Sequence, residues 1–473
     1  MTDHALTNIH GTLETGRHEC LGSWTLMHSA SAQVYTARSV SDLIGIIEKA
    51  KASALTITPR GAGHSYADAA LNQGQVIVKL DELRRVISWD PATGIMDVEP
   101  GVTVGDVCRL GLASGWWPAV APGTQAATIG GCAAMNVHGK NHWKKGSFGE
   151  HVVEFDIATA AGDRLAISRA NDSPLFHAAI GGAGMLGFFT RLRLRLMRVG
   201  SGGCTVSRVP ATSLRDMFTI FERETDRADC MFGWIDGFAS GRALGRGVAW
   251  AARVNAETSL QRGRGSRAAL WTHAPVLDLA HLAMNKPFVR TGNFAVYMHN
   301  RVHGAVTRET SLTGFDFRLD SIPGWERVWY PLGAREFQAF VPEIHAPEVF
   351  AELLRRSQLS GLVPYLCSMK RHRSDAFLLS YVRTGYSLSL DYRATVRNAR
   401  QLDKLLRELR DVVLAAGGRL YLAKDDVLDA PSYALQMGSS TIKAFLSLKK
   451  EHDPSGLFMS DLYRRVFAGM PLG

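Results

Sequence analysis

The sequence lacks the long apolar segments that cross a membrane. No run of roughly 18 or more apolar residues occurs in its 473 residues, and the first residues, MTDHALTNIHG, do not have the basic-then-apolar layout of a secretory signal. A disordered or fibrous protein is also excluded, because 46% of the residues are hydrophobic and 21% are charged. We therefore expect a globular cytoplasmic protein of roughly two or three domains.

Cysteine is scarce, and no two cysteines are close enough to form a CxxC clip or a zinc knuckle. His138 and His142 stand four residues apart, but Gly139 between them and the absence of a carboxylate in an HExxH arrangement argue against zinc. The sequence thus predicts no metal site. It also predicts a reducing compartment in which the six cysteines are buried thiols: Cys20, Cys108, Cys132, Cys204, Cys230 and Cys367.

Positive charge exceeds negative charge. The 54 Lys and Arg residues outnumber the 44 Asp and Glu residues, which gives a formal net charge of +10. An anionic partner is therefore expected: a phosphorylated substrate, a cofactor pyrophosphate or an acidic lipid surface. The basic residues are scattered and do not alternate with aromatic residues, so nucleic-acid binding is not expected.

The order of apolar patterns predicts a strand near Val34, a helix over 39–50 and a strand over 54–58, which together form a β-α-β opening. The alternating run over 190–197 predicts a strand with one face on the core. The glycine-rich stretch 199–204 suggests a boundary. We expect three parts, at residues 1–200, 201–420 and 421–473.

The middle part, from 201 to 420, is expected to form one mixed sheet with helices packed on it. Its predicted strands are Phe337–Val341, Ala376–Val382 and Tyr386–Tyr392, and its predicted helices are Pro347–Ser357 and Ala394–Ala416. The last part is too short to fold alone, so we expect it to pack back on an earlier part.

The first glycine-rich turn follows a predicted strand and reads Thr58-Pro-Arg-Gly-Ala-Gly-His-Ser-Tyr-Ala-Asp. Gly61 and Gly63 allow positive φ, so consecutive amide groups can face a phosphate. A dinucleotide fingerprint GxGxxG is the rival interpretation. It would need glycine where Tyr66 stands, although Asp81 lies about 20 residues further on, as that fingerprint requires. A simple loop at the end of a strand is a third interpretation.

A second region, from Ala121 to Val152, inserts glycines and polar side chains into an otherwise apolar part of the chain. A large ligand lying against bare backbone explains this composition better than solvent exposure does. A third segment, Gly181-Gly-Ala-Gly-Met-Leu-Gly, also indicates close packing. In this segment, packing within the core explains the small residues equally well.

Taken together, these motifs resemble the FAD-binding domain of the vanillyl-alcohol-oxidase (PCMH) type. Within that superfamily the sequence is most similar to the decaprenylphosphoryl-ribose 2′-oxidases. The motifs occur in the order Arg60-Gly-Ala-Gly-His-Ser, Pro122-Gly-Thr, Thr128-Ile-Gly-Gly, His138-Gly-Lys-Asn-His, Gly146-Ser-Phe-Gly-Glu-His and Gly182-Ala-Gly-Met-Leu-Gly. Later matches are Glu336-Phe-Gln-Ala-Phe-Val, Lys370, Gly385-Tyr-Ser-Leu-Ser-Leu-Asp, Ala423-Lys-Asp and the ending Ser460-Asp-Leu-Tyr-Arg-Arg.

The resemblance implies an α+β protein whose two-subdomain FAD-binding domain is closed by a cap domain, with the C-terminal segment returning to the FAD domain. The two glycine turns would bind the pyrophosphate of FAD through backbone amides. The residues implied in cofactor binding are Arg60, Gly61, Ala62, Gly63, His64, Ser65, Tyr66, Pro122, Gly123, Thr124, Thr128, Gly130, Gly131, Asn136, His138, Gly139, Asn141 and Gly184.

The same resemblance places Lys424, His138 and Tyr66 at the reacting centre. Oxidation of a secondary alcohol requires a proton acceptor and a cation beside the flavin or alkoxide. Lys424 suits the role of the cation, and His138 is the candidate base, although hydrogen bonding to Tyr66 or to substrate is an equal interpretation for it. The residues expected to bind substrate are Lys140, Gln338, Lys370, Ser389 and Asp391.

Two departures from the family pattern leave the substrate open. His64 stands where alditol and aldonolactone oxidases bond a histidine to the flavin, so an O₂-using oxidase with covalent FAD is the alternative function. Ser389 replaces a pocket cysteine, and Glu336 and His372 replace other pocket residues. The expected partners are a sugar or phospho-sugar, free or lipid-linked at a membrane surface, and a reductase that consumes the keto product.

Overall fold

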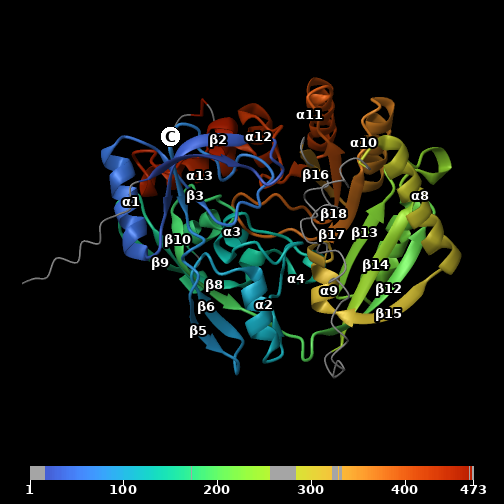
Figure 1. Ribbon diagram of the computed structural model, residues 1–473, viewed down its shortest axis with the longest axis horizontal. Coiled ribbons are helices and arrows are strands. Elements are labelled where there is room, and N and C mark those ends of the chain that lie inside the picture. Colours follow the sequence, from blue (N-terminus) through green and yellow to red (C-terminus); the bar gives the residue numbers. More distant parts are fainter. Residues whose placement is uncertain are drawn as a thin grey trace, which may run out of the picture.

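The computed structural model describes residues 16–171, 173–255, 284–321, 329, 333–467, 469 and 470. Figure 1 shows two bodies side by side. The blue-to-green part of the chain and the red C-terminal helices form the left body, and a large sheet with its helices forms the right body. Helices and sheets occur together but in separate layers, which confirms the predicted α+β class.

The first sheet is built from residues near the N-terminus. Its strand order is β1-β2-β4-β3; β1 pairs antiparallel with β2, whereas β4 pairs in parallel with both β2 and β3. Ser39 caps helix α1 by accepting from the backbone N–H of Asp42. The β-α-β opening is therefore present, in β1 (Arg17–Gly22), β2 (Ser29–Thr36), α1 (Val40–Ala52), β3 (Ile57–Arg60) and β4 (Val76–Lys79).

The second sheet has five described strands in the order β5-β6-β10-β8-β9, all antiparallel. Its predicted alternating strand is β10 (Phe188–Arg195), in which Leu192 and Leu194 are buried. The other strands of this sheet are β5 (Val86–Asp90), β6 (Ile95–Val98), β8 (Val152–Ala158) and β9 (Arg164–Ser168). A separate two-stranded sheet pairs β7 (Trp116–Trp117) with β11 (Met197–Arg198), and the helices of this part of the chain are α2 (Val104–Leu112), α3 (Ile129–Ala134), α4 (His142–Lys145) and α5 (Pro174–Ala179).

The third sheet corresponds to the predicted mixed sheet. Its described strands follow the order β15-β12-β14-β13-β17-β18-β16-β19, and every pairing among them is antiparallel, so the sheet is not mixed in direction. The strands are β12 (Gly203–Ala211), β13 (Cys230–Ile235), β14 (Gly247–Asn255), β15 (Val306–Ser311), β16 (Ala334–Pro342), β17 (Leu366–His372), β18 (Gly385–Arg393) and β19 (Arg419–Leu420).

One predicted strand is wrong. Residues 376–382 form a loop rather than a strand, because their polar groups bond to other parts of the fold instead of a ladder. The backbone N–H of Leu378 donates to the carbonyl of His177, and the hydroxyl of Tyr381 donates to the carbonyl of Asn136 at 2.7 Å. The apolar run that suggested a strand is therefore buried against the first body.

Helix α6 (Leu214–Glu224) covers one face of the third sheet, and the opposite face borders the cavity and carries α9 (Leu312–Asp316), whose Phe315 packs on Phe232. Within β13, Gly233 faces Met217 and Phe221 of α6, so the neighbouring residues Phe232 and Trp234 point to the opposite face. The helices of this body are α6 (Leu214–Glu224), α8 (Lys286–His303), α9 (Leu312–Asp316), α10 (Ala346–Leu359) and α11 (Ala399–Ala415).

The C-terminal segment lies against the first sheet, where red helices overlie blue strands in Figure 1. Ile57 of β3 forms a parallel bridge with Phe458, and the amide of Ile57 donates to the carbonyl of Leu457. The segment contains α12 (Ala430–Met437), α13 (Ser439–His452) and α14 (Asp461–Phe467). The exact division into three parts at residues 200 and 420 stays a prediction.

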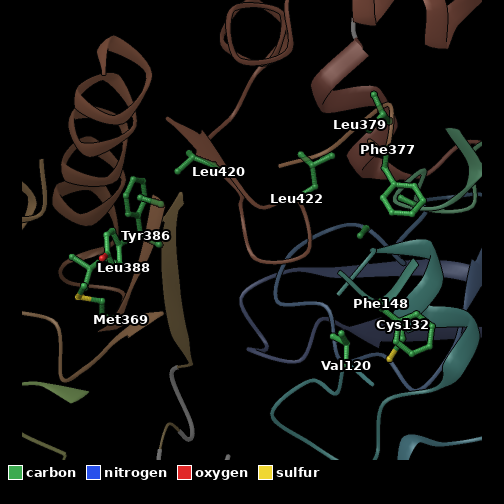
Figure 2. Packing of buried hydrophobic residues seen from close by; sticks show 14 of the residues in the cluster. Val120, Cys132, Phe148, Met369, Phe377, Leu379, Tyr386, Leu388, Leu420 and Leu422 are labelled. Atoms are coloured by element: carbon green, nitrogen blue, oxygen red, sulfur yellow. The ribbon is translucent and has the colours of Figure 1, made fainter. Parts of the chain in front are cut away.

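A single hydrophobic cluster connects the two bodies. Figure 2 shows Val120, Cys132 and Phe148 from the first body and Tyr386 and Leu388 from the third sheet as members of this cluster. This continuous core holds the third sheet at a fixed position over the glycine-rich turns. Among the described residues, no helix is both long and apolar enough to cross a bilayer.

Candidate active site

A cavity of about 1360 Å³ lies between the two bodies, and both glycine-rich turns line it. The turns also touch each other: a Cβ added to Gly61 would lie 2.2 Å from the hydroxyl oxygen of Thr128. Backbone from two separate segments thus forms one slot. The predicted juxtaposition of Gly61–Ser65 with Gly123–Gly131 is present.

The first turn requires glycine at position 63. Gly63 has φ +73°, and an added Cβ would come within 2.4 Å of the guanidinium of Arg60. Arg60 lies beneath the turn and donates to the carbonyls of Gly22, at 2.8 Å, and Ala70. Its side chain supports the turn from below and leaves the upper surface, formed by backbone, open to the cavity.

The second turn is fixed by a hydrogen bond within the turn and by another to Asp320, which follows α9 in the chain. Thr128 caps α3 by accepting from the amide of Gly131, and the amide of Gln125 donates to the carboxylate of Asp320 at 2.7 Å. A Cβ added to Gly123 would meet no atom within 4 Å, although Gly123 lines the cavity. Gly123 therefore leaves room for a ligand, not for another part of the protein.

The opposite wall of the cavity is one face of the third sheet. Side chains alternate between the two faces of a strand, so residues two apart on β16, β17 and β18 point the same way. Register brings Glu336 opposite Asp391, Gln338 opposite Ser389, and Lys370 opposite Ser387. Of these, the residues that line the cavity are Glu336, Lys370, Ser389 and Asp391.

Lys424 forms the centre of a charged cluster on this wall. Its ammonium lies 2.7 Å from both carboxylate oxygens of Glu336, which is 5% exposed, and Ser389 donates its hydroxyl proton to the same carboxylate. Burial, followed by the charge of Glu336, raises the pKa of Asp391 well above its usual value, which favours its protonated form. Lys424 is thus paired with one charged carboxylate, that of Glu336.

Tyr66 joins this cluster to the first glycine turn. The ammonium of Lys424 lies 4.5 Å from the centre of the Tyr66 ring, and Trp24 stacks on the ring with centroids 4.6 Å apart. The backbone N–H of Tyr66 donates to the carbonyl of Ala423, next to Lys424, at 2.8 Å. Burial, followed by the charge of Glu336, raises the pKa of Tyr66, so its hydroxyl stays protonated.

His138 is buried beside the cluster, in surroundings that make it a weak proton acceptor. Burial, followed by the charge of Lys370, lowers the pKa of His138 well below its usual value. Its Nε2 lies 3.2 Å from the amide nitrogen of Gln338, and its Nδ1 has no hydrogen-bond partner among the described residues. The neutral ring also packs against His372 and Phe340.

Two further lysines line the cavity near His138. Lys140 donates to the backbone carbonyl of Asp316, and burial lowers its pKa. Lys370 is partly accessible because it faces the cavity. Burial, followed by the charge of Lys424, lowers its pKa to about 7. Burial in the cavity wall thus favours the neutral form of both lysines relative to a lysine in water.

Most of the expected site residues line the cavity, and a few lie just behind it. The lining residues are Gly61, Ala62, Gly63, His64, Ser65, Tyr66, Pro122, Gly123, Thr124, Thr128, Gly130, Gly131, His138, Lys140, Gly184, Lys370, Ser389, Asp391 and Lys424. Arg60, Asn136, Gly139, Asn141 and Gln338 are not among the residues that line it. Asn136 and Asn141 bond to Asp375 and to the carbonyl of Ala119, which holds the connecting loops in place.

Several residues of the site were not assigned a role from the sequence. Glu336 was noted only as a departure from the family pattern, yet it is the direct partner of Lys424. The alternation Glu336-Phe-Gln-Ala contained a usable signal, because it places Glu336 and Gln338 on one face. Asp316 and Asp320 also line the cavity, and no motif in the sequence marks them.

Comparison with known proteins agrees with this geometry. Residues 31–168 match the family model of the FAD binding domain. The fit is visible in the structure, since Gly61, Gly63 and Gly123 present bare backbone to a cavity long enough to span both turns. Fold and site together define an FAD-dependent oxidoreductase.

Three relatives place the chain more closely. The decaprenylphosphoryl-β-D-ribose oxidase of Mycolicibacterium smegmatis is 28% identical over 429 residues, covering 87% of this chain and 89% of that protein. An uncharacterised protein of Streptomyces coelicolor is 30% identical over 379 residues, covering 77% of this chain and 100% of that protein. A Neurospora crassa protein provisionally named a D-arabinono-1,4-lactone oxidase is 28% identical over 178 residues, covering 37% and 31%.

The chain belongs to the PCMH-type FAD-dependent oxidoreductases and is similar along most of its length to decaprenylphosphoryl-ribose oxidase. The predicted family, the α+β fold and the FAD cofactor are confirmed. The roles of the individual site residues stay predictions.

Proposed function

We propose that this protein oxidises a secondary hydroxyl group of a sugar, free or phosphorylated, by transferring a hydride to its FAD. The observation that carries the proposal is the cluster of Lys424, Glu336 and Tyr66, which faces the glycine-lined slot across a shared cavity. Similarity to a ribose oxidase over most of the chain supports a sugar as the substrate.

Bound FAD supplies the hydride acceptor, and the protein supplies the charge and the positioning. The ammonium of Lys424 lies between Tyr66 and the third sheet, where it would stabilise negative charge that develops on the reacting groups. The protonated carboxyl of Asp391 and the hydroxyl groups of Ser389 and Tyr66 suit the hydrogen bonding of a polyhydroxylated substrate.

A phosphate on the substrate would meet a positively charged wall. Arg109, Lys140 and Arg318 all line the cavity, and Arg318 stacks on Trp250 at 5.1 Å. These cations support an anionic substrate, in accordance with the net charge of +10. The lipid-linked form of the substrate, attachment to a membrane surface and a partner reductase stay predictions.

The proposal is tested by anaerobic reduction of the enzyme-bound flavin. Purified holoenzyme is mixed with a panel of free and phosphorylated sugars, and loss of the visible flavin absorbance is followed. We expect at least one sugar to bleach the flavin, and we expect the matching deoxy sugar, which lacks the reacting hydroxyl, to leave the absorbance unchanged. A flavin that no member of the panel reduces would contradict the proposal.

The covalent-flavin oxidase is kept as a second candidate because His64 lines the cavity within the first glycine turn. Acid precipitation separates the two candidates. In the covalent case the yellow colour stays with the wild-type pellet and moves to the supernatant in the His64→Ala variant. Colour in the wild-type supernatant would eliminate the covalent bond. Oxygen consumption during turnover then distinguishes an oxidase from a dehydrogenase.

A further inference from the structure

Three lysines line the cavity, and they differ in what holds their amino groups. Lys424 is paired with Glu336, and Lys140 donates to the carbonyl of Asp316. For Lys370, no hydrogen-bond acceptor or carboxylate lies within bonding distance among the residues that the structure describes. Lys370 therefore faces the cavity with its amino group available to a ligand.

Lys370 also lies in the middle of the reacting wall. It is on β17, opposite Ser387 of β18, and the cavity-facing side chain of Ser389 follows two residues later on that strand. Backbone hydrogen bonds to both neighbouring strands hold β17 at this place, since β17 lies between β13 and β18. A substrate between the glycine slot and this wall would therefore meet the Lys370 amino group directly.

We propose that Lys370, as a neutral amine, accepts the proton of the substrate hydroxyl during oxidation. This inference rests on the proposed function. The O–H bond breaks and its proton binds the lone pair of the Lys370 amine, which becomes an ammonium ion. The C–H bond breaks at the same carbon, its electron pair leaves as hydride to the oxidised FAD, and a C=O bond forms. The substrate is oxidised by two electrons and the cofactor is reduced by two.

The charges around Lys370 explain how its amine can be neutral. Burial disfavours its charged form most, and the charges of Lys424, from the turn after β19, and Lys140, from the segment after α3, act in the same direction. Glu336 of β16 acts in the opposite direction and is already paired with Lys424. The nearby histidines His138, His142 and His372 have lowered pKa values and add no charge near neutral pH.

Other candidates for the proton acceptor are less suited. His138 is a weak base in its buried position. Glu336 accepts hydrogen bonds from Lys424 and Ser389, so its oxygens are engaged before a substrate arrives. The pKa of Lys370, at about 7, leaves a large fraction of the amine neutral near pH 7 and so suits a general base there.

The first test measures flavin bleaching against pH with a sugar that reduces the wild-type enzyme. We expect the wild-type rate constant to rise about tenfold per pH unit below about pH 7 and to level off above it, because only the neutral amine accepts a proton. The Lys370→Met variant keeps the length of the side chain. It should lose this pH dependence and slow by about 100-fold or more, with FAD content unchanged.

Small primary amines added to a smaller variant, Lys370→Ala, should restore part of the rate, and more basic amines should restore more. A lysine that only binds substrate phosphate gives a different result: KM rises for phosphorylated sugars, while the maximal rate and its pH profile stay as in the wild type. That result, or a pH limb that persists in Lys370→Met, would overturn the proposal.

The second test measures the protonation state of the Lys370 amine directly and needs no turnover. Holoenzyme is treated with an amine-acylating reagent for a short time at a series of pH values, and the modification of Lys370 is measured by mass spectrometry beside a free lysine peptide. We expect labelling of Lys370 to reach half its maximum near pH 7, about three and a half pH units below the free peptide. Labelling that follows the free peptide would contradict a neutral Lys370.

The two tests separate failure of the inference from failure of the proposed function. If labelling shows a neutral amine but no sugar reduces the flavin, the proposed function fails and the proton-acceptor role falls with it. If sugars reduce the flavin and Lys370→Met changes neither rate nor pH profile, only the inference fails.

Discussion

The two walls of the cavity recognise their ligands by different means. The wall from the first body includes the bare backbone of Gly61, Gly63 and Gly123, and Arg60 lies outside the cavity lining, where it donates to the carbonyls of Gly22 and Ala70. The wall from the third sheet is made of side chains, with Lys424 and Glu336 paired on it. Under the proposed function, backbone geometry would hold the cofactor and side-chain charge would act on the substrate.

This difference predicts how each wall of the cavity should respond to substitution. A backbone cradle depends on conformation and open space, so it is lost when a side chain fills it. A charged wall depends on the identity of each group, because removal of one partner leaves a buried charge uncompensated. Substitutions on the two walls should therefore separate cofactor binding from catalysis.

The largest effect is expected on the side-chain wall. Replacing Lys424 by Ala removes the cation beside Tyr66 and should slow substrate-dependent flavin bleaching by about 100- to 1000-fold, while FAD stays bound. Stopped-flow absorbance measures the rate, and the flavin-to-protein absorbance ratio measures the cofactor content.

A double variant controls for the carboxylate that this substitution leaves unpaired. Lys424→Ala combined with Glu336→Gln has no unpaired charge at this position, so it should recover stability without recovering rate. A single variant that bleaches at the wild-type rate would refute the assigned role of Lys424.

An intermediate effect is expected on the backbone wall. Replacing Gly123 by Val should lower FAD affinity by about tenfold or more without changing the melting temperature of the apoprotein, because the new side chain meets only the cavity. Equilibrium titration with FAD measures the affinity.

Gly292 provides the matched control for this variant. It also has no atom within 4 Å of an added Cβ, but it lies on α8 and does not line the cavity. Gly292→Val should bind FAD as the wild type does. Equal losses in both variants would show that Gly123 has no special relation to the cofactor.

The sequence allowed the backbone wall to be predicted well, because its function depends on glycine spacing. Gly61 and Gly63 after a strand, and the Pro122–Gly131 turn, are local patterns, and both turns line one cavity. The side-chain wall was harder to predict from the sequence. Lys424 and Glu336 are 88 residues apart, and their pairing depends on how β16 and the turn after β19 are arranged.

The remaining misreadings have the same physical origin. The Ala376–Val382 run has the composition of a strand, but contacts with His177 and Asn136 hold it as a loop. The weak basicity of His138 depends on burial by Phe340 and His372, which are distant in sequence. Both features follow from tertiary contacts that no local pattern contains.

The smallest effect on flavin binding and bleaching is expected from substitutions at Asp426, which connects the third sheet to the C-terminal segment and acts on stability. Asp426 accepts hydrogen bonds from Arg335 of β16 at 2.7 Å and from His28 at 3.0 Å when that ring is protonated on Nε2. These partners lower the pKa of the buried Asp426 carboxyl to about 2, against a strong opposing effect of burial. Because the pKa of Asp426 is lower in the folded than in the unfolded protein, its ionisation stabilises the folded state at pH values above the unfolded-state pKa.

Asp426→Asn should therefore reduce the free energy of unfolding by about 2 kcal/mol near pH 7. The gap between wild type and variant should shrink as the pH falls from about 4 toward 2, because the folded carboxyl becomes protonated there. Urea unfolding at several pH values measures it. Asp411→Asn, which removes an exposed carboxylate paired with Arg410, should cost less than about 1 kcal/mol, and an equal cost at both positions would contradict the role of burial.

The most direct test of the contrast between the two walls compares bound FAD and bleaching rate in Gly123→Val and Lys424→Ala, prepared in parallel. Gly123→Val should lose FAD but bleach near the wild-type rate once FAD saturates it. Lys424→Ala should keep its FAD and bleach slowly at every substrate concentration. If each variant lost both properties together, cofactor binding and catalysis would not be divided between the two walls, and the account would be wrong.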